Sequence, residues 1–228
     1  MDLRKKITIV TGHFGSGKTN FSINLARHAA QGGARVTLID MDIVNPYFRS
    51  ADFVGQYPGV NVLAPDFANS NVDLPYLGGG VETALEGDAP VIVDVGGDDA
   101  GAVALGRYRP VLLRQDYDLL CVISCYRYLT RSPEECVEYL RDIEAACGLS
   151  ATGLINNSNL GKATTPEDVR ASVLFAEEVS RLSGVPLLLT AADKRLEGTL
   201  DDIEPIEYVD VLVKTIWDKE EEEWQKSR

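Results

Sequence analysis

The chain has 228 residues, of which 45% are hydrophobic and 25% are charged, and its formal net charge at pH 7 is −13. This length and apolar content fit one domain, spanning residues 1–228, with a sizeable buried core. Because a strongly acidic surface repels the phosphates of nucleic acids and of anionic lipids, the charge argues against both as partners.

We expect no export signal at the N-terminus of this sequence. The apolar run at residues 7–10 is too short for a signal peptide, and no later run approaches the roughly 18 residues that would cross a membrane. We therefore expect a cytoplasmic protein that is not bound to a membrane.

The four cysteines lack the Cys-x-x-Cys spacing of a zinc site or of a small secreted scaffold. Reduced, buried thiols are the simplest interpretation, since free cysteine is among the most commonly buried residue types. An alternative rests on Cys121 and Cys125, which lie four residues apart on a predicted strand and so point to one face. These two thiols would share a soft metal at a dimer interface.

Short β-rich runs alternate with helical runs along the chain, which is the pattern of a mostly parallel sheet with helices on both faces. Several of these runs are apolar almost throughout, as fully buried parallel strands are. The sequence therefore predicts an α/β fold, with strands within residues 6–12, 34–42, 59–65, 89–97, 117–125, 151–157 and 185–193.

Three helices have recognisable start and stop signals. The first follows a glycine-rich loop and ends near Gln31, before Gly32 and Gly33. The second and third lie within residues 132–148 and 165–184. Each of these two begins with a Ser or Thr N-cap followed by proline and ends at a glycine.

Near the C-terminus, apolar residues at helical spacing predict a last helix that packs on the sheet: Val209, Leu212, Val213 and Ile216. The acidic tail after it, about residues 218–228, is expected to be solvated. Two other segments, 43–59 and 66–80, are rich in Asn, Pro, Gly and Tyr and follow strands. Since ligands of open α/β sheets bind beyond the carboxyl ends of the strands, we expect both segments to line the functional face.

Residues 12–19 read GHFGSGKT and match the phosphate-binding pattern G-x-x-x-x-G-K-[ST] on a strand-to-helix turn. The glycines let the loop turn its amides toward phosphate oxygens at a helix N-terminus. We expect Lys18 to reach the β- and γ-phosphates and to act in catalysis, and the Thr19 hydroxyl to bind Mg²⁺. The predicted nucleotide contacts in this loop are Gly12, His13, Phe14, Gly15, Ser16, Gly17, Lys18, Thr19 and Asn20.

A nucleotide site also needs a carboxylate for the metal, and the run VIVDVGG at residues 91–97 supplies Asp94 at the end of a buried strand. Gly96 and Gly97 would let a backbone amide approach the γ-phosphate, so Gly97 is a predicted nucleotide contact. Asp98 and the residue after it are expected to begin the next helix, where aspartate commonly serves as a cap.

The second predicted strand ends in LIDMD, with Asp40 and Asp42 separated by one residue and therefore on one side of the strand. Two carboxylates beside a phosphate site would repel the nucleotide unless they hold the metal's water shell or orient a water molecule. We assign Asp42 to the attacking water and Asp40 to the Mg²⁺ hydration shell, with solvated acids at a strand exit as the alternative.

At these residues the chain resembles the MinD/ParA/CobQ group of P-loop ATPases, in the signal-recognition and nickel-insertion (SIMIBI) class. The resemblance rests on GHFGSGKT, the D-x-D of LIDMD, the run VIVDVGG and the Asn at the end of GLINN, and it covers most of the chain in order. It implies a seven- or eight-stranded, mainly parallel sheet, slow nucleotide hydrolysis and a homodimer formed face to face across the nucleotides.

The preferred nucleotide base is predicted from residues 156–159, which depart from the motif of related GTPases. GTPases of this class read guanine with an N-K-x-D motif, whose Asp accepts hydrogen bonds from two guanine donors. The corresponding stretch here is NNSN, and Asn159 offers an amide NH₂ where two acceptors are needed. ATP, with ADP as product, is therefore predicted over GTP. The resemblance places Asn156 at the adenine edge, and residues 190–193 are expected to flank the base.

A second departure lies in the phosphate loop. MinD and ParA loops carry a signature lysine that reaches the partner's phosphates, whereas this chain has His13 there, followed by Phe14 in place of a glycine. Because imidazole is short and mostly uncharged at pH 7, we expect His13 to be a neutral donor or packing group, with a solvent-facing loop cap as the alternative. Arg49, Arg127 and Arg131 could supply the missing charge, and ordinary salt bridges are the alternative for the last two.

Together these features predict a Mg²⁺-dependent ATPase switch that acts on a protein client, with cofactor or metal-centre maturation as a candidate process. One alternative is a small-molecule phosphotransferase or an ATP-dependent ligase of the same fold, with segment 66–80 holding the substrate. Another is a regulatory module that binds nucleotide without useful hydrolysis. ATP turnover with and without small acids or alcohols separates these alternatives.

Overall fold

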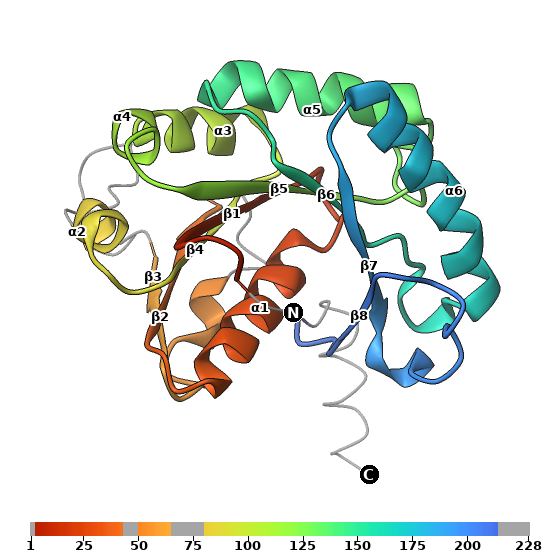
Figure 1. The fold of residues 1–228 in the computed structure, drawn as a ribbon, viewed down its shortest axis with the longest axis horizontal. Helices are drawn as coiled ribbons and strands as arrows, with labels where there is room; N and C mark the ends of the chain where they lie inside the picture. Colours follow the sequence, from red (N-terminus) through yellow and green to blue (C-terminus); the bar gives the residue numbers. More distant parts are fainter. Residues whose placement is uncertain (1–2, 43–49, 65–79, 214–228) are drawn as a thin grey trace, which may run out of the picture.

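The computed structural model describes residues 3–42, 50–64 and 80–213, and it confirms the predicted α/β fold (Figure 1). Its sheet has the order β3-β2-β4-β1-β5-β6-β7-β8, and every neighbouring pair is parallel. The strands are β1 (Ile7–Thr11), β2 (Val36–Met41), β3 (Val60–Leu63), β4 (Val91–Val95), β5 (Tyr117–Ile123), β6 (Gly153–Asn156), β7 (Leu187–Asp193) and β8 (Ile206–Val209).

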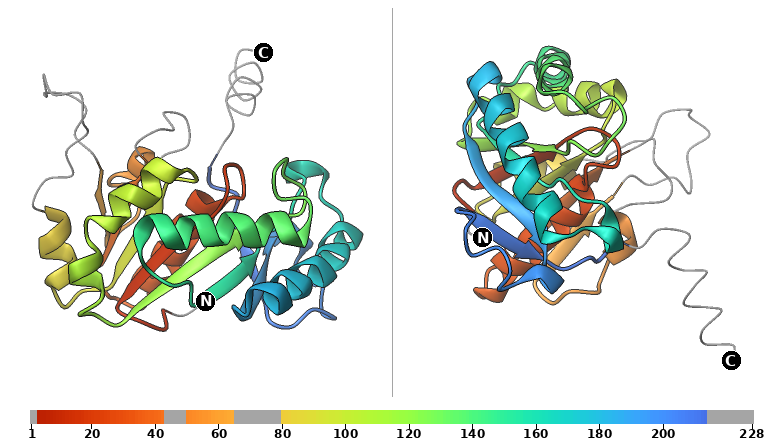
Figure 2. Two further views of the ribbon diagram at one scale, coloured as in Figure 1. Left: turned by 90° about the horizontal axis from the view of Figure 1, so that it is seen from above. Right: turned by 90° about the vertical axis from the view of Figure 1, so that its right-hand side faces the viewer.

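Helices cover both faces of the sheet (Figures 1 and 2). Helix α1 (Lys18–Gln31) packs on one face. The other face is covered by α2 (Gly80–Glu86), α3 (Asp99–Gly106), α4 (Arg109–Leu112), α5 (Pro133–Cys147) and α6 (Pro166–Ser183). The described part of the chain also contains short 3-10 helices: η1 (Ser50–Phe53), η2 (Gly161–Ala163) and η3 (Lys194–Leu196).

The central strands are buried on both faces, which explains their continuous apolar sequences. Successive residues of a strand point to opposite faces. Accordingly, Val10 and Ile92 pack with α1, whereas Ile9 and Val93 pack with the helices of the other face. All four side chains are fully buried, as parallel sheets with two covered faces require.

The strand order reverses around β1, which lies between β4 and β5 although β2 follows it in the chain. In open α/β sheets such a switch point opens a crevice at the carboxyl ends of the strands. The glycine loop follows β1 at this position. The left view of Figure 2 shows the loops after β1 and β5 at the same edge of the sheet.

The seven predicted strands are all present, but the predicted C-terminal helix is wrong at its start, because Val209 is the last residue of β8. The stretch from Ile206 also alternates as a strand does, since Ile206 and Tyr208 pack in one cluster and Val209 packs in another. Ile216 and the acidic tail lie outside the described residues, as do residues 43–49 and 66–79 of the two predicted loops.

The start and stop signals of α5 and α6 act as the sequence predicts. Ser132 and Glu135 form a capping box at α5, and Thr165 and Asp168 form one at α6. Each helix ends at a glycine in the left-handed conformation, with φ of 68° at Gly148 and 74° at Gly184.

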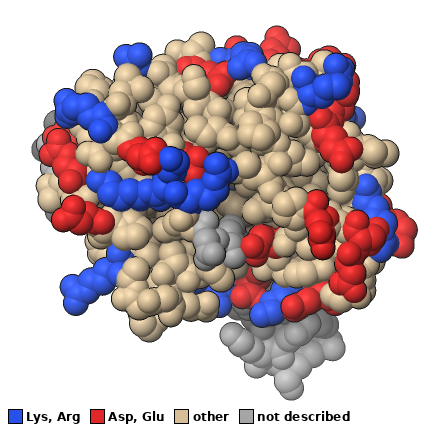
Figure 3. All heavy atoms as spheres, viewed as in Figure 1, with Lys and Arg blue, Asp and Glu red and all other residues tan. Residues whose placement is uncertain are grey.

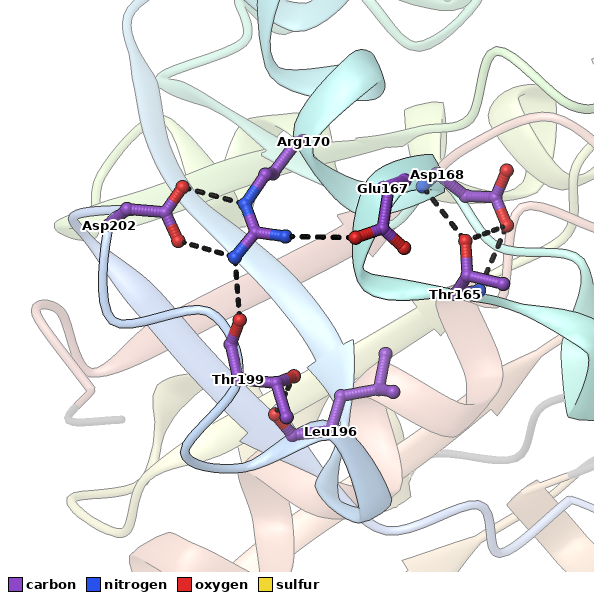
Figure 4. Close-up of polar contacts among 7 residues, drawn as sticks. All are labelled: Thr165, Glu167, Asp168, Arg170, Leu196, Thr199 and Asp202. Atoms are coloured by element: carbon purple, nitrogen blue, oxygen red, sulfur yellow. Dashed lines mark hydrogen bonds and ion pairs between the residues drawn. The ribbon is translucent and has the colours of Figure 1, made fainter.

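Helix α6 is also tied to the segment that leads into β8 (Figure 4). Arg170 Nε donates to one carboxylate oxygen of Asp202 over 2.7 Å, and its Nη2 donates to the other over 2.8 Å. The same Nη2 donates to the carbonyl oxygen of Thr199 over 2.7 Å. This two-pronged contact fixes the connection between β7 and β8 against the N-terminal turns of α6.

On the face seen in Figure 3, basic and acidic side chains are interspersed. Exposed ion pairs of this kind include Lys5 with Asp116 and Arg114 with Glu86. Because such pairs are solvated, they contribute little to stability, and the buried clusters on the two faces of the sheet hold the fold together.

Candidate functional site

The phosphate loop adopts a conformation that only glycine tolerates at several positions. Gly12, Gly15 and Gly17 have φ values of 154°, 78° and 88°. A Cβ atom on Gly12 would lie 2.4 Å from the carbonyl oxygen of Val122 on β5, and one on Gly17 would lie 2.3 Å from Nδ2 of Asn157. The pattern of glycines is therefore required by close contacts with β5 and with the segment after β6.

Lys18 is buried in an ion pair. Its Nζ atom lies 3.4 Å from Oδ2 of Asp42, and only 5% and 4% of the two side chains are exposed. Asp40 fixes this partner, since its Oδ1 accepts a hydrogen bond from the backbone N–H of Asp42 over 3.0 Å. Lys18 therefore contributes to the stability of the fold as well as to the site, because breaking a buried ion pair is costly.

Asp94 stands beside Asp40 on the neighbouring strand, in direct register between β4 and β2. Both carboxylates are fully buried. Asp94 accepts a hydrogen bond from the Ser50 hydroxyl over 2.8 Å and one from the Ser22 hydroxyl over 3.3 Å. Neither serine was predicted from the sequence, because a single serine has no pattern that marks it as a partner of a distant strand.

The environment of Asp94 favours its protonated form. Burial raises its pKa from 3.8 to about 7, while the charge of Lys18 lowers it and the charge of Asp40 raises it further. The hydroxyls of Ser50 and Thr19 partly offset these effects by hydrogen bonding. A bound dication would reverse the balance, because it stabilises the ionised carboxylate.

The loop after β4 touches the phosphate loop through Gly97. A Cβ atom at this position would lie 2.8 Å from both the carbonyl oxygen of Gly12 and the backbone nitrogen of Phe14. Only a glycine allows this approach. Asp98 is the N-cap of α3 and accepts a hydrogen bond from the backbone N–H of Gly101 over 2.9 Å, which confirms its predicted role.

A comparison with known protein families agrees with this phosphate-loop geometry. Residues 7–214 match the CobQ/CobB/MinD/ParA nucleotide binding domain, CbiA. The chain belongs to this family. The predicted family is therefore confirmed, and the protein is a P-loop nucleotide-binding domain. No curated protein shows significant sequence similarity to the chain.

Solved structures with a similar fold include FtsY proteins and a signal recognition particle protein. Chloroplast FtsY from Physcomitrella patens has 19% identity and a TM-score of 0.56, covering 91% of this chain and 63% of its own. FtsY from Mycoplasma mycoides has 14% identity and a TM-score of 0.53, with 84% and 61% covered. The Signal Recognition Particle 54 kDa protein from Aeropyrum pernix K1, in complex with GDP, has 16% identity and a TM-score of 0.50. The match covers 82% of this chain and 41% of that protein. At these identities the likeness establishes the fold, and this chain spans only part of each neighbour's length.

In this CbiA-type domain, His13 packs toward α5. Its ring meets the ring of Tyr139 edge to face, with centroids 5.4 Å apart and an interplanar angle of 74°. Its Nδ1 lies 3.1 Å from the carbonyl oxygen of Phe14, whose side chain is 57% exposed. The predicted packing role of His13 is consistent with this arrangement.

The side chain of Asn20, a predicted nucleotide contact, is instead used to hold the segment after β8. Its Nδ2 donates to the carbonyl oxygen of Asp210 over 3.0 Å, and its Oδ1 accepts from the backbone N–H groups of Leu212 and Val213 over 2.8 and 3.2 Å. Asn24, one turn later, bonds the backbone of Asp210 as both donor and acceptor. Residues 210–213 therefore dock on α1 directly after the phosphate loop.

The two asparagines at the end of β6 point in opposite directions. Asn156, predicted at the adenine edge, is fully buried. Its Nδ2 donates to the hydroxyls of Ser172 and Thr190 over 2.9 and 3.4 Å, and its Oδ1 accepts from the N–H and hydroxyl of Ser158. Since these four bonds use its whole capacity, Asn156 is not free to bind a base.

Asn157, which was not singled out from the sequence, faces the phosphate loop instead. Its Nδ2 donates to the carbonyl oxygen of Ser16 over 2.7 Å. The third asparagine of this stretch, Asn159, donates through Nδ2 to the carbonyl oxygen of Asn157 over 2.8 Å and accepts through Oδ1 from the N–H of Gly161 over 3.1 Å.

The candidate arginines differ in their contacts. Arg127, in the turn after β5, donates from Nε to the carbonyl oxygen of Gly15 over 2.5 Å. Arg131 lies over the ring of Tyr128, with its guanidinium carbon 5.2 Å from the ring centroid. Arg49 lies outside the described residues.

A shared metal on Cys121 and Cys125 finds no support in the geometry. Strand β5 ends at Ile123, so Cys125 is not on the strand as predicted. Burial raises the pKa of the Cys121 thiol, which keeps it protonated. All four cysteines are free, and within the described ranges no three His, Cys, Asp or Glu side chains form a metal-binding group.

The predicted Mg²⁺ ligands Thr19, Asp94 and Asp40 fit the usual chemistry of that ion, which takes one or two carboxylates together with water and substrate phosphates. No helix in the described part of the chain has the length and apolar character needed to span a membrane.

Proposed function

We propose that this protein is a Mg²⁺-dependent ATPase that works as a slow molecular switch on a protein client. The observation that carries the proposal is the buried group of Lys18, Asp40, Asp42 and Asp94 beneath the phosphate loop. Burying one lysine among three carboxylates is expensive for a fold, and a buried carboxyl group with a raised pKa, such as Asp94, is typical of functional sites.

Each member of the group has a distinct part. Lys18 binds the β- and γ-phosphates, and Thr19 and Asp94 hold Mg²⁺, with Asp40 bonding its water shell. The ion would neutralise charge on the phosphates. Asp42, 3.4 Å from Lys18 Nζ, lies at the phosphate end of the site and orients the attacking water.

The preference for ATP over GTP rests on two asparagines after β6. Asn159 replaces the carboxylate that guanine recognition needs, and its single amide oxygen already accepts from Gly161 N–H. We transfer the adenine contact from Asn156 to Asn157, because the Nδ2 of Asn157 binds the phosphate loop and its Oδ1 accepts no hydrogen bond from any described residue. That oxygen would accept the exocyclic amine of adenine.

A homodimer across the nucleotide face is part of the proposal. Phe14 in the phosphate loop is 57% exposed, and Tyr128 and Leu129 in the turn after β5 are 73% and 58% exposed. The bond between Arg127 and Gly15 brings the two loops together, so that these apolar side chains flank the site. Burying them against a second copy or a client would complete the site.

The test is Mg²⁺-dependent ATP hydrolysis by the purified protein, compared with Asp42→Ala and with Asp116→Ala as a matched surface control. Asp116 pairs with Lys5 at the surface, so its loss should leave turnover unchanged. We expect Asp42→Ala to bind ATP but to lose about 100-fold in hydrolysis. Equal rates in Asp42→Ala and the parent would contradict the assignment, and GTP that competes as well as ATP would contradict the choice of base.

The same assay separates a switch from a transferase. Small carboxylic acids and alcohols are added one at a time, and phosphorylated or ligated products are measured alongside ADP. A switch shows no stimulation by these compounds, whereas a product formed in step with ADP would assign the protein to the phosphotransferase or ligase class.

A further inference from the structure

A second positively charged side chain, Arg127, lies against the phosphate loop, and it belongs to the turn after β5. Arg127 follows β5, and its Nε donates to the carbonyl oxygen of Gly15 over 2.5 Å. Its Cδ and Nε atoms would each lie 3.3 Å from a Cβ on Gly15. The side chain therefore packs directly on the backbone of the loop, at a position where any residue larger than glycine would push it away.

The guanidinium has unused binding capacity. Within the described ranges, no group accepts a hydrogen bond from its terminal nitrogens, and no carboxylate pairs with it. Burial lowers the pKa of Arg127, yet arginine remains protonated in proteins. A charged fork is thus held beside a loop whose amides are arranged to bind an anion.

Arg131, four residues later, provides a contrast within the same turn. Its guanidinium stacks on Tyr128, and its backbone N–H donates to Glu135 over 2.8 Å at the start of α5. Its contacts are therefore local to the turn. Of these two arginines, Arg127 is the one that reaches across to the phosphate loop.

The turn that carries Arg127 is rigidly held. The Thr130 hydroxyl donates to the carbonyl oxygen of Ser124 over 3.0 Å, and the Tyr126 hydroxyl donates to the carbonyl oxygen of Asp168 on α6 over 2.9 Å. Leu129 has a φ of 63°, a left-handed conformation that is costly for a residue with a side chain. Strain of this kind persists only where surrounding contacts enforce the geometry, and here they fix the position of Arg127.

We propose that Arg127 is a second phosphate-binding cation, which acts within the same chain on the phosphates of the bound nucleotide. The inference rests on the proposed nucleotide-binding function and extends it. Lys18 shares its charge with Asp42, and Asp40 adds negative charge nearby, so one lysine is a weak counterion for a polyphosphate. Arg127 adds a charge that the phosphate-loop sequence itself lacks.

The experiment compares the parent with Arg127→Gln, Arg127→Lys and the matched control Arg131→Gln. Affinities for a non-hydrolysable ATP analogue with Mg²⁺ and for inorganic tripolyphosphate are measured by calorimetry, and each ligand-free protein is melted. We expect Arg127→Gln to lose about tenfold or more in affinity for both ligands and Arg127→Lys to stay within about threefold of the parent. Arg131→Gln should match the parent, and the ligand-free melting temperatures should be alike.

Two results would overturn the proposal. One is unchanged affinity for both ligands in Arg127→Gln. The other is an equal loss in Arg127→Gln and Arg127→Lys, which would make the bond to Gly15 a brace of the loop rather than a source of charge. The proposed function fails separately, if the parent binds no ATP analogue. Tripolyphosphate binding that depends on Arg127 would still support the arginine's role in that case.

Discussion

The carboxyl edge of the sheet has a charged half and a neutral half. At or after the carboxyl ends of β1, β2 and β4 lie Lys18, Asp40, Asp42 and Asp94, all of them buried. Around the carboxyl ends of β6 and β7 lies a network of hydroxyls and amides, in which Asn156 bonds Ser158, Ser172 and Thr190. Both halves are buried.

The two halves differ in whether their polar groups find enough partners within the protein when no ligand is bound. In the neutral half, the donors and acceptors of Asn156 are matched, and such a network stabilises and rigidifies a fold. In the charged half, burial raises the pKa of Asp94 to about 7 despite Lys18. A site that favours protonation of its own carboxylate gains when a metal and a phosphate arrive. The comparison indicates that the charged half is built for ligands and the neutral half for its own stability.

The largest effect is expected for Lys18→Ala. It removes the partner of buried Asp42, which should cost about 3–5 kcal/mol of stability, and it should weaken ATP binding about 100-fold. Urea unfolding and an ATP titration measure the two effects. Lys194→Ala is the control, because Lys194 is exposed. A variant as stable as the parent would show that the lysine is not needed to compensate the carboxylates.

Asp94 provides a pH-dependent test of the charged half in the protein free of metal and nucleotide. Its folded pKa of about 7 lies above the ordinary 3.8, so between these values the folded state holds a proton that the unfolded state has released. Stability due to this group is therefore present below pH 4 and is lost as the pH rises to 7, by about 4 kcal/mol.

Asp94→Asn should abolish this loss and make the ligand-free protein more stable than the parent at pH 7. Urea unfolding of both proteins from pH 4.5 to 8 measures the free energy of unfolding. Subtracting one pH profile from the other removes the contribution of the other acidic residues, which both proteins share. Parallel curves for parent and variant would mean that Asp94 stays ionised throughout.

The neutral half is tested by paired variants of adjacent asparagines. Asn156→Ala removes a fully buried amide with four bonds and should cost about 2 kcal/mol of stability, with little change in ATP affinity. Asn157→Ala should cost less stability but weaken ATP binding about tenfold, because Asn157 holds the loop through Ser16. The reverse pattern would return the base contact to Asn156.

The smallest effect is expected at His13. Its edge-to-face contact with Tyr139 is worth about 1 kcal/mol, and a neutral imidazole adds little at phosphates. His13→Ala should therefore change ATPase turnover less than about threefold, and His13→Lys should raise it if a dimer forms. Both are measured across protein concentration. Loss of a concentration-dependent rate in His13→Ala would show that His13 acts across the dimer.

Sequence patterns were sufficient wherever the information is local or periodic. The glycine loop, the strand that supplies Asp94, the capping boxes of α5 and α6, and the Asp98 cap all depend on residues within a few positions of one another. Seven strands followed from apolar runs, because a strand buried on both faces must be apolar throughout. Only β8 was missed, since four residues carry too little alternation to outweigh a competing helical spacing.

Only the tertiary structure decided which distant side chains meet. Strand parity turned Asn156 toward α6 and Asn157 toward the phosphate loop, and a shift of one residue in a strand end reverses such roles. The segment after β8 took the side chain of Asn20, and the turn after β5 placed Arg127 on Gly15. By itself, the sequence determined the family and the phosphate loop. The folded chain decided the partners of that loop, because contacts between residues more than a hundred positions apart depend on register, strand order and packing, which no local pattern encodes.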